Sequence, residues 1–92
     1  MLHPEREELH GITVVVEGHA GGFWVGRFHE TIPRGIVLLD VGRHDPAPGA
    51  PSPEAWIDRI RRFGLRVEEH RVVIPTQDVQ AITRLSDWRV RA

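Results

Sequence analysis

Histidine is the side chain with which this sequence could most readily do chemistry at neutral pH, because its ring can bind a metal ion or transfer a proton. The chain has six histidines, which are His3, His10, His19, His29, His44 and His70. Metal sites usually draw two ligands from one element, at spacings such as His-x-His or His-x-x-x-His. No two of these histidines have either spacing, and the chain has no cysteine to supply a thiolate ligand. We therefore expect no metal site, and we expect the histidines to lie on the surface.

The residue types needed for nucleophilic catalysis are scarce. Cysteine is absent, and the only serines are Ser52 and Ser86, which are explained as a helix cap and a turn residue. The glycine-rich stretch at residues 19–22 is followed by neither a lysine nor a helical pattern. It therefore predicts a hairpin turn and not a phosphate-binding loop. We expect no catalytic residue, no cofactor and no small-molecule substrate.

The cationic side chains are all arginine, and these twelve arginines with thirteen acids give a formal net charge of −1. A chain with this balance has no long-range attraction for nucleic acid. Four arginines gather in and just after a predicted helix, namely Arg59, Arg61, Arg62 and Arg66. Such a face is either solvated and balanced by Glu54 and Asp58, or holds phosphates or an acidic partner. The spacing of Asp58 and Arg62 also suits an ion pair along the helix.

Three short segments rich in β-branched and aromatic residues must carry the core, at residues 12–17, 23–30 and 36–41. Turns containing glycine or proline separate them, which predicts an antiparallel meander. Val15 lies on the opposite face from Val14 and Val16, so we expect both faces of the first strand to be covered, as in a small barrel. Gly26, inside the second segment, predicts a sharp bend or a close backbone approach.

Residues 42–64 form an insertion that consists of an exposed loop and one helix. The loop is rich in proline and glycine and has no hydrophobic period. Ser52 then caps a helix over residues 53–63. This helix carries an apolar stripe, which is made of Trp56, Ile57, Ile60 and Phe63. We expect the stripe to close one side of a barrel, with Trp56 and Ile60 buried against the strands.

The flanking segments complete a single domain over residues 1–92. We expect a short helical turn at residues 4–9, and we expect Trp88 to pack back onto the body of the domain. The inserted helix is followed by a sheet-edge segment at residues 65–68. A strand at residues 72–74, a tight turn at 75–78 and a last strand at 79–83 come after it. No apolar run reaches the roughly 18 residues that cross a bilayer. We expect a soluble, cytoplasmic protein without membrane contacts.

This order of elements resembles the Sm-like family of small SH3-like barrels, which includes bacterial RNA chaperones. The resemblance is carried by the bend at Gly26 and by the runs at residues 24–28, 36–40 and 74–82. It implies a mainly β fold, an antiparallel barrel of about five strands. Two features depart from the pattern of the family, since Pro75 and Thr76 replace an Arg-Gly pair, and Gly35 or a neighbouring residue replaces a loop asparagine.

The function expected from these features is that of a non-enzymatic module acting through protein–protein contacts, as a homo-oligomer or as a small subunit of a larger complex. Open barrels of this size expose strand edges, and an edge that pairs with a neighbouring chain satisfies its backbone groups. The alternative is Sm-like RNA binding. The residues predicted to contact RNA lie in two tight loops and on the inserted helix, and are Thr31, Arg34, Thr76, Gln77, Arg59 and Arg62.

Overall fold

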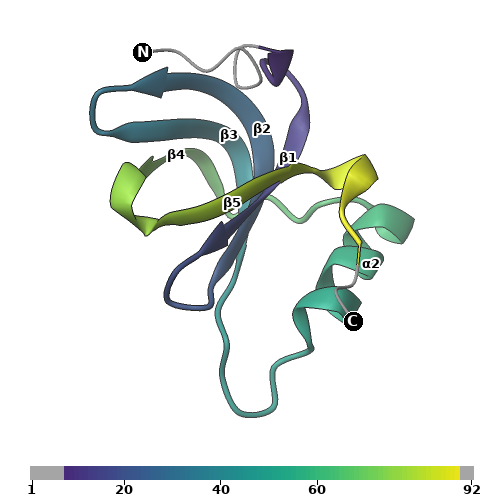
Figure 1. Cartoon of the computed structure of the whole chain (residues 1–92). Helices are drawn as coiled ribbons and strands as arrows, with labels where there is room; N and C mark the ends of the chain where they lie inside the picture. Colours follow the sequence, from purple (N-terminus) through teal and green to yellow (C-terminus); the bar gives the residue numbers. More distant parts are fainter. Residues whose placement is uncertain (1–7, 90–92) are drawn as a thin grey trace.

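A computed structural model describes residues 8–89 as a mainly β domain built on one five-stranded antiparallel sheet (Figure 1). The strands are β1 (Thr13–Gly18), β2 (Phe23–Ile32), β3 (Gly35–His44), β4 (Glu69–Pro75) and β5 (Val79–Arg84). One α-helix, α2 (Pro53–Phe63), lies between β3 and β4 in the chain. Two short 3₁₀ helices follow β4 and β5, and these are η1 (Thr76–Asp78) and η2 (Leu85–Asp87). The predicted helical turn at residues 4–9 lies mostly outside the described residues.

The sheet is open, so the prediction of a closed barrel is wrong. The strand order is β4-β3-β2-β1-β5, and β4 and β5 are its two edges. Figure 1 shows these two strands diverging from η1, one toward β3 and the other toward β1. Because η1 is only three residues long and its neighbours diverge, no ladder forms between β4 and β5. The turn after β1 instead bonds to η1, where the N–H of His19 donates to the carbonyl of Asp78 at 3.1 Å.

The main core lies on one face of the curved sheet. It gathers alternate residues of β1 with apolar residues of the neighbouring strands, including Val14, Val16, Phe28, Ile36, Leu38 and Ile74. Their spacing of two along each strand is the period that puts side chains on one face of a sheet. The predicted meander of three strands is thus confirmed, and its alternation decides on which face of the sheet each buried side chain lies.

A second core covers the opposite face of the sheet. Val15 and Val25 pack there against Ile57 and Ile60 of α2 and against Trp88. The predictions that both faces of β1 are covered and that Trp88 packs on the body are therefore confirmed. The cover on this second face is a helix and a tail, however, and not the far wall of a barrel (Figure 1).

The predicted irregularity at Gly26 is also confirmed. The register between β2 and β3 shifts between Val25 and Arg27, so that β3 contributes one extra residue there. A side chain on Gly26 would place its Cβ 3.0 Å from a methyl group of Val41 and 3.1 Å from the carbonyl oxygen of Leu39. The glycine therefore allows the close approach that a bulge requires.

Several predicted strand boundaries are wrong, and two of them change the role of a segment. The chain stays in β3 as far as His44, because Gly42 to His44 continue the ladder with the start of β2. Residues 65–67 do not extend the sheet edge, whereas the N–H of Glu68 donates to the carbonyl of Val41 at 2.8 Å, and β4 begins at Glu69 and not at Val72. The side chain of Leu65 packs instead onto the second core. Leu65 therefore belongs to the loop that connects α2 to β4, and its side chain helps to cover the second face of the sheet.

The ends of α2 form as predicted. The hydroxyl of Ser52 accepts a hydrogen bond of 3.1 Å from the N–H of Ala55. Gly64 ends the helix at a φ of 92°, with its N–H donating to the carbonyl of Ile60 at 2.8 Å. Within residues 8–89, no helix is long and apolar enough to cross a membrane.

The apolar stripe of α2 is only partly buried. Ile57 and Ile60 lie in the second core, as predicted for Ile60, but Trp56 is only half-buried. Phe63 is 80% exposed. Phe63, the last residue of the helix, does not pack on the second core. Leu65, two residues later, does.

We expect Ile57→Ala to destabilise the domain strongly, because Ile57 is fully buried between α2 and the sheet. Truncating such a residue typically costs about 2–5 kcal/mol of a total near 5–10 kcal/mol. The melting temperature should fall by about 8 °C or more. Arg62→Ala is the control on the exposed side of the same helix and should change stability by less than about 0.5 kcal/mol. An Ile57→Ala protein that melts like the wild type would contradict the placement of α2.

Candidate functional site

The two tight turns that carry predicted RNA contacts meet at one end of the sheet. The N–H of Thr76 donates to the carbonyl of Arg34 at 3.3 Å, and Gly35 pairs with Pro75. A shallow hollow of about 530 Å³ lies over this junction, and it is lined by Pro33, Arg34, Val73, Pro75, Thr76 and Gln77. The structure therefore brings together three of the predicted contacts. Thr31 lies in β2 opposite Ile36, outside this lining.

Gly35 makes this junction possible. A Cβ atom at this position would lie 2.0 Å from the carbonyl oxygen of Ile74 and 2.9 Å from the Cα atom of Pro75. No side chain fits at such distances, so the close approach of the two turns requires glycine. The role of Gly35 is therefore to let the two turns meet.

Arg59 and Arg62 are not part of this junction. They lie on α2, and Arg62 forms the predicted ion pair with Asp58, in which Nε is 3.1 Å from Oδ2. Arg59 lines a different hollow at the end of the helix. Only part of the RNA contact set predicted from the sequence is therefore contiguous.

Arg61 has a structural role that the sequence did not indicate. Its guanidinium donates to the carbonyl oxygen of Leu85, with Nη2 at 2.7 Å, and also to the carbonyl oxygen of Trp88. These bonds hold α2 against the C-terminal segment. They also give hydrogen-bond partners to two backbone carbonyl groups that follow β5. The four arginines therefore do not act as one basic face.

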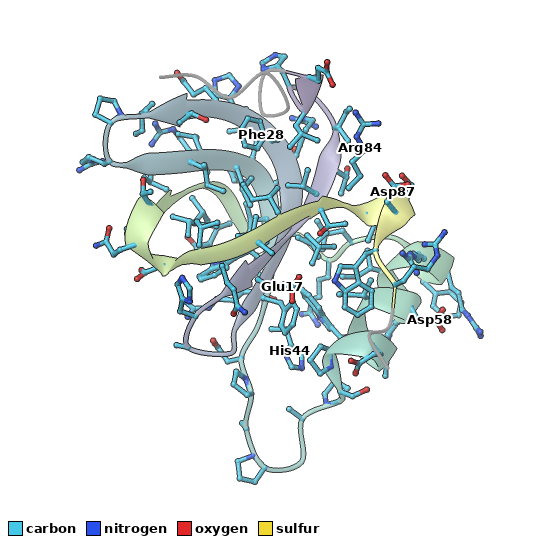
Figure 2. The ribbon with its side chains drawn as sticks, viewed as in Figure 1. Glu17, Phe28, His44, Asp58, Arg84 and Asp87 are labelled. Atoms are coloured by element: carbon cyan, nitrogen blue, oxygen red, sulfur yellow. The ribbon has the colours of Figure 1, made fainter. Side chains whose placement is uncertain are left out.

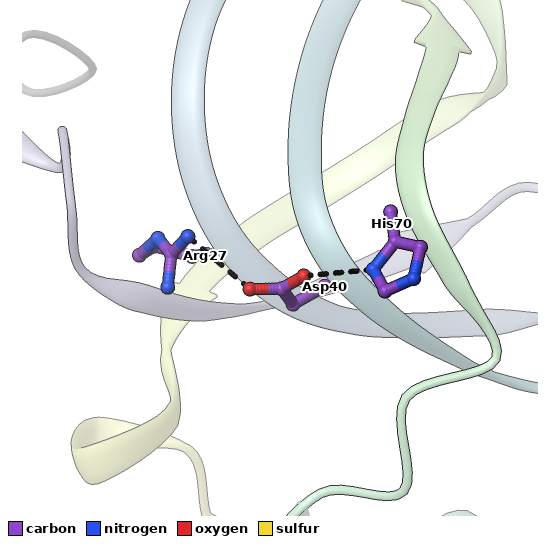
Figure 3. A network of polar contacts seen from close by, with 3 residues as sticks. All are labelled: Arg27, Asp40 and His70. Atoms are coloured by element: carbon purple, nitrogen blue, oxygen red, sulfur yellow. Dashed lines mark hydrogen bonds and ion pairs between the residues drawn. The ribbon is translucent and has the colours of Figure 1, made fainter.

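A polar cluster crosses three strands on the surface (Figure 3). Asp40 lies between Arg27 and His70, with Oδ2 3.2 Å from Nη2 of Arg27 and Oδ1 3.4 Å from Nδ1 of His70. Asp40 has a φ of 53°, a left-handed conformation that Asp and Asn tolerate better than most residues. The three side chains are largely exposed, so these contacts stabilise the bulge only weakly and form no enclosed reaction site.

His44 is buried, contrary to the prediction that the histidines lie on the surface. It is 6% exposed, and its Nε2 lies 2.7 Å from the carbonyl oxygen of Pro51. Its ring packs against Trp56, with centroids 5.3 Å apart, and lies near the start of α2 (Figure 2). His44 thus fastens the inserted loop to the end of β3. Its Nδ1 atom has no hydrogen-bond partner among residues 8–89.

Clusters that could hold a metal ion are missing from the described part of the chain. No three side chains of His, Asp or Glu within residues 8–89 come close enough together to share an ion.

The outer edges of β4 and β5 are the two unpaired edges of the sheet within residues 8–89. Each strand is bonded on one side only, so its other side presents free N–H and carbonyl groups. Charged or titratable residues and proline, which normally block such edges, occupy the first three positions and the last position of β4, but only the last position of β5. In β4 they flank the apolar centre Val72 to Ile74, and in β5 the only charge is Arg84 at its last position.

Comparison with protein-family models and with curated proteins found no match to this chain. The sheet edges, the turn junction and the surface of α2 are the features of residues 8–89 through which the chain could act.

We expect Gly35→Ala to destabilise the domain more than Gly49→Ala, in spite of the identical chemical change. The added methyl group collides with Ile74 at position 35, whereas at position 49 it meets nothing within 4 Å. Gly49 has a φ of 83°, so its substitution should cost about 1–2 kcal/mol from backbone strain alone. Gly35→Ala should add an overpacking cost of about 1–3 kcal/mol or more. Urea unfolding measures both, and equal costs would disprove the close junction of the two turns.

Proposed function

We propose that this chain is a non-enzymatic module that assembles through the free edges of its sheet, with further copies of itself or with a protein subunit of a larger complex. The observation that carries this proposal is that the outer edges of β4 and β5 are not paired with another strand within residues 8–89. An unpaired edge favours pairing with another chain, because the free backbone groups are then hydrogen-bonded. The absence of cysteine is compatible with a cytoplasmic location.

The geometry suits repeated assembly. β4 has seven residues and β5 has six, so the edge of one copy matches the other edge of the next in length. The two edges belong to different strands, which makes such a contact heterologous, and a heterologous contact closes into a ring or extends as a filament. We favour a ring or a small complex, since the charged ends of β4 limit uncontrolled stacking.

The fold is proposed to be a divergent form of the Sm-like type. Support comes from the meander β1-β2-β3 with its bulge at Gly26, from the short η1 that links β4 to β5, and from the return of β5 beside β1. The insertion that carries α2 and the proline at position 75 are the departures. Fold type alone does not define a function, so the free edges carry the proposal.

The first test is the mass of the protein in solution. We expect light scattering at micromolar concentration to give a multiple of the 10.5 kDa chain. Val73→Lys, which places a charge at the centre of the β4 edge, should shift the protein toward monomer because a charge there opposes strand pairing. The matched control is Arg62→Ala, on α2 and away from both edges.

A wild-type protein that stays monomeric at tens of micromolar and recovers no subunit from lysate would contradict the proposal. Loss of assembly in Arg62→Ala, or full assembly in Val73→Lys, would show that contacts form elsewhere than at the edges.

RNA binding is the second candidate, and one observation favours it. Arg34, Thr76 and Gln77 converge on the hollow at the turn junction, where a cation and several hydrogen-bond donors face solvent together. Single-stranded RNA is commonly held by such groups in loops. The formal charge of −1 opposes tight binding, because affinity for nucleic acid rests largely on neutralising phosphates.

Fluorescence anisotropy with short A-rich and U-rich RNA at low salt tests this candidate. Binding should weaken by about threefold or more in Arg34→Ala and stay unchanged in Arg62→Ala, whose cation is already paired with Asp58. If neither RNA binds at tens of micromolar, RNA is not the ligand of this junction.

A further inference from the structure

The two exposed large hydrophobic residues found within residues 8–89 lie close together in the chain. Phe63 ends α2 and is 80% exposed, and Val67 follows four residues later and is 44% exposed. A hollow of about 440 Å³ lies beside Phe63. We call this hollow the α2 groove, and the six lining residues that matter here are Trp56, Ile60, Phe63, Leu65, Arg59 and Arg66.

The groove is a consequence of how the insertion is packed. Ile57 and Ile60 cover the second face of the sheet, and Leu65 folds back onto the same core after Gly64 ends the helix. Phe63 is thereby left outside, next to the half-buried Trp56. A partner that covers Phe63 removes its apolar surface from water, which favours binding. An exposed aromatic side chain at the rim of a hollow is a common feature of protein interaction sites.

The charge of the groove is positive, because its two arginines are not neutralised. Arg59 and Arg66 form no ion pair with any other residue that the structure describes, whereas Arg62 is paired with Asp58. The single acid in the lining is Glu68. Arginine is well suited to carboxylates, since its planar guanidinium can bind both oxygens at once.

We infer that the α2 groove binds a short acidic peptide segment of a partner protein. A bulky apolar side chain of that segment packs on Phe63 and Trp56, and its carboxylates pair with Arg59 and Arg66. Apolar anchoring beside arginine is the composition typical of binding hot spots. No residue of β4 or β5 lines the groove, so this contact is separate from assembly at the sheet edges. The module would then assemble through one surface and recruit through another.

Selection of displayed random peptides on the immobilised full chain tests this inference without assuming a partner. We expect the enriched peptides to share a bulky apolar residue flanked by Asp or Glu. Their binding, measured by anisotropy, should weaken by about tenfold in Phe63→Ser and by about three- to tenfold in the double variant Arg59→Gln with Arg66→Gln. Arg62→Gln is the matched control and should bind like the wild type, because Arg62 is already paired.

Phe63→Ser changes an exposed side chain, so its melting temperature should match that of the wild type and exclude misfolding as the cause. Failure to enrich any peptide, enrichment of peptides without acids, or binding indifferent to Phe63→Ser would each overturn the inference. A lower mass in solution for Phe63→Ser would overturn it as well, by showing that a second copy occupies the groove. Edge assembly is tested independently by Val73→Lys, so the two proposals can fail separately.

Discussion

The rest of the structure depends on the burial of three consecutive valines in β1. Val14, Val15 and Val16 are all inaccessible to solvent, although adjacent residues of a strand point to opposite faces. One face can be covered by the curvature of the sheet itself, but the other requires a separate element. The insertion between β3 and β4 supplies that element, since Ile57 and Ile60 of α2 pack against Val15 and Val25. The helix is therefore an essential part of the hydrophobic core and not an addition to a complete barrel.

The way in which α2 is fastened decides which surfaces remain for function. His44 holds the inserted loop through the carbonyl of Pro51, and Arg61 holds the C-terminal segment through two backbone carbonyls. With the helix fixed at both sides, its final turn projects beyond the sheet, and Phe63 is left in solvent. The position in which α2 is held thus explains both the packing of Ile57 and Ile60 on the sheet and the groove beside Phe63.

The curvature of the sheet follows from local irregularities. Extra residues in β3 near Gly26 and in β2 near His29 bend the ladder, and Asp40 adopts a left-handed conformation at the first of these bulges. Bulges increase the local twist of a strand pair. The bent sheet brings β4 and β5 to a common short turn but leaves them bonded to different neighbours, which creates two free edges. Assembly through these edges would supply the pairing that closure would have provided.

The sequence by itself determined the elements whose signals are local. Alternation of apolar residues located the strands, Ser52 and Gly64 delimited α2, and Val15 indicated that both faces are covered, because each of these patterns is complete within a few residues. The tertiary structure alone decided that the sheet stays open, that His44 is buried, that Phe63 is exposed, and that Arg34 meets Thr76. These outcomes depend on bulge geometry and on contacts between residues far apart in the chain. No short-range sequence pattern encodes these outcomes. Whether a residue of a helix stripe or of a loop is buried depends on where a distant segment of the chain packs.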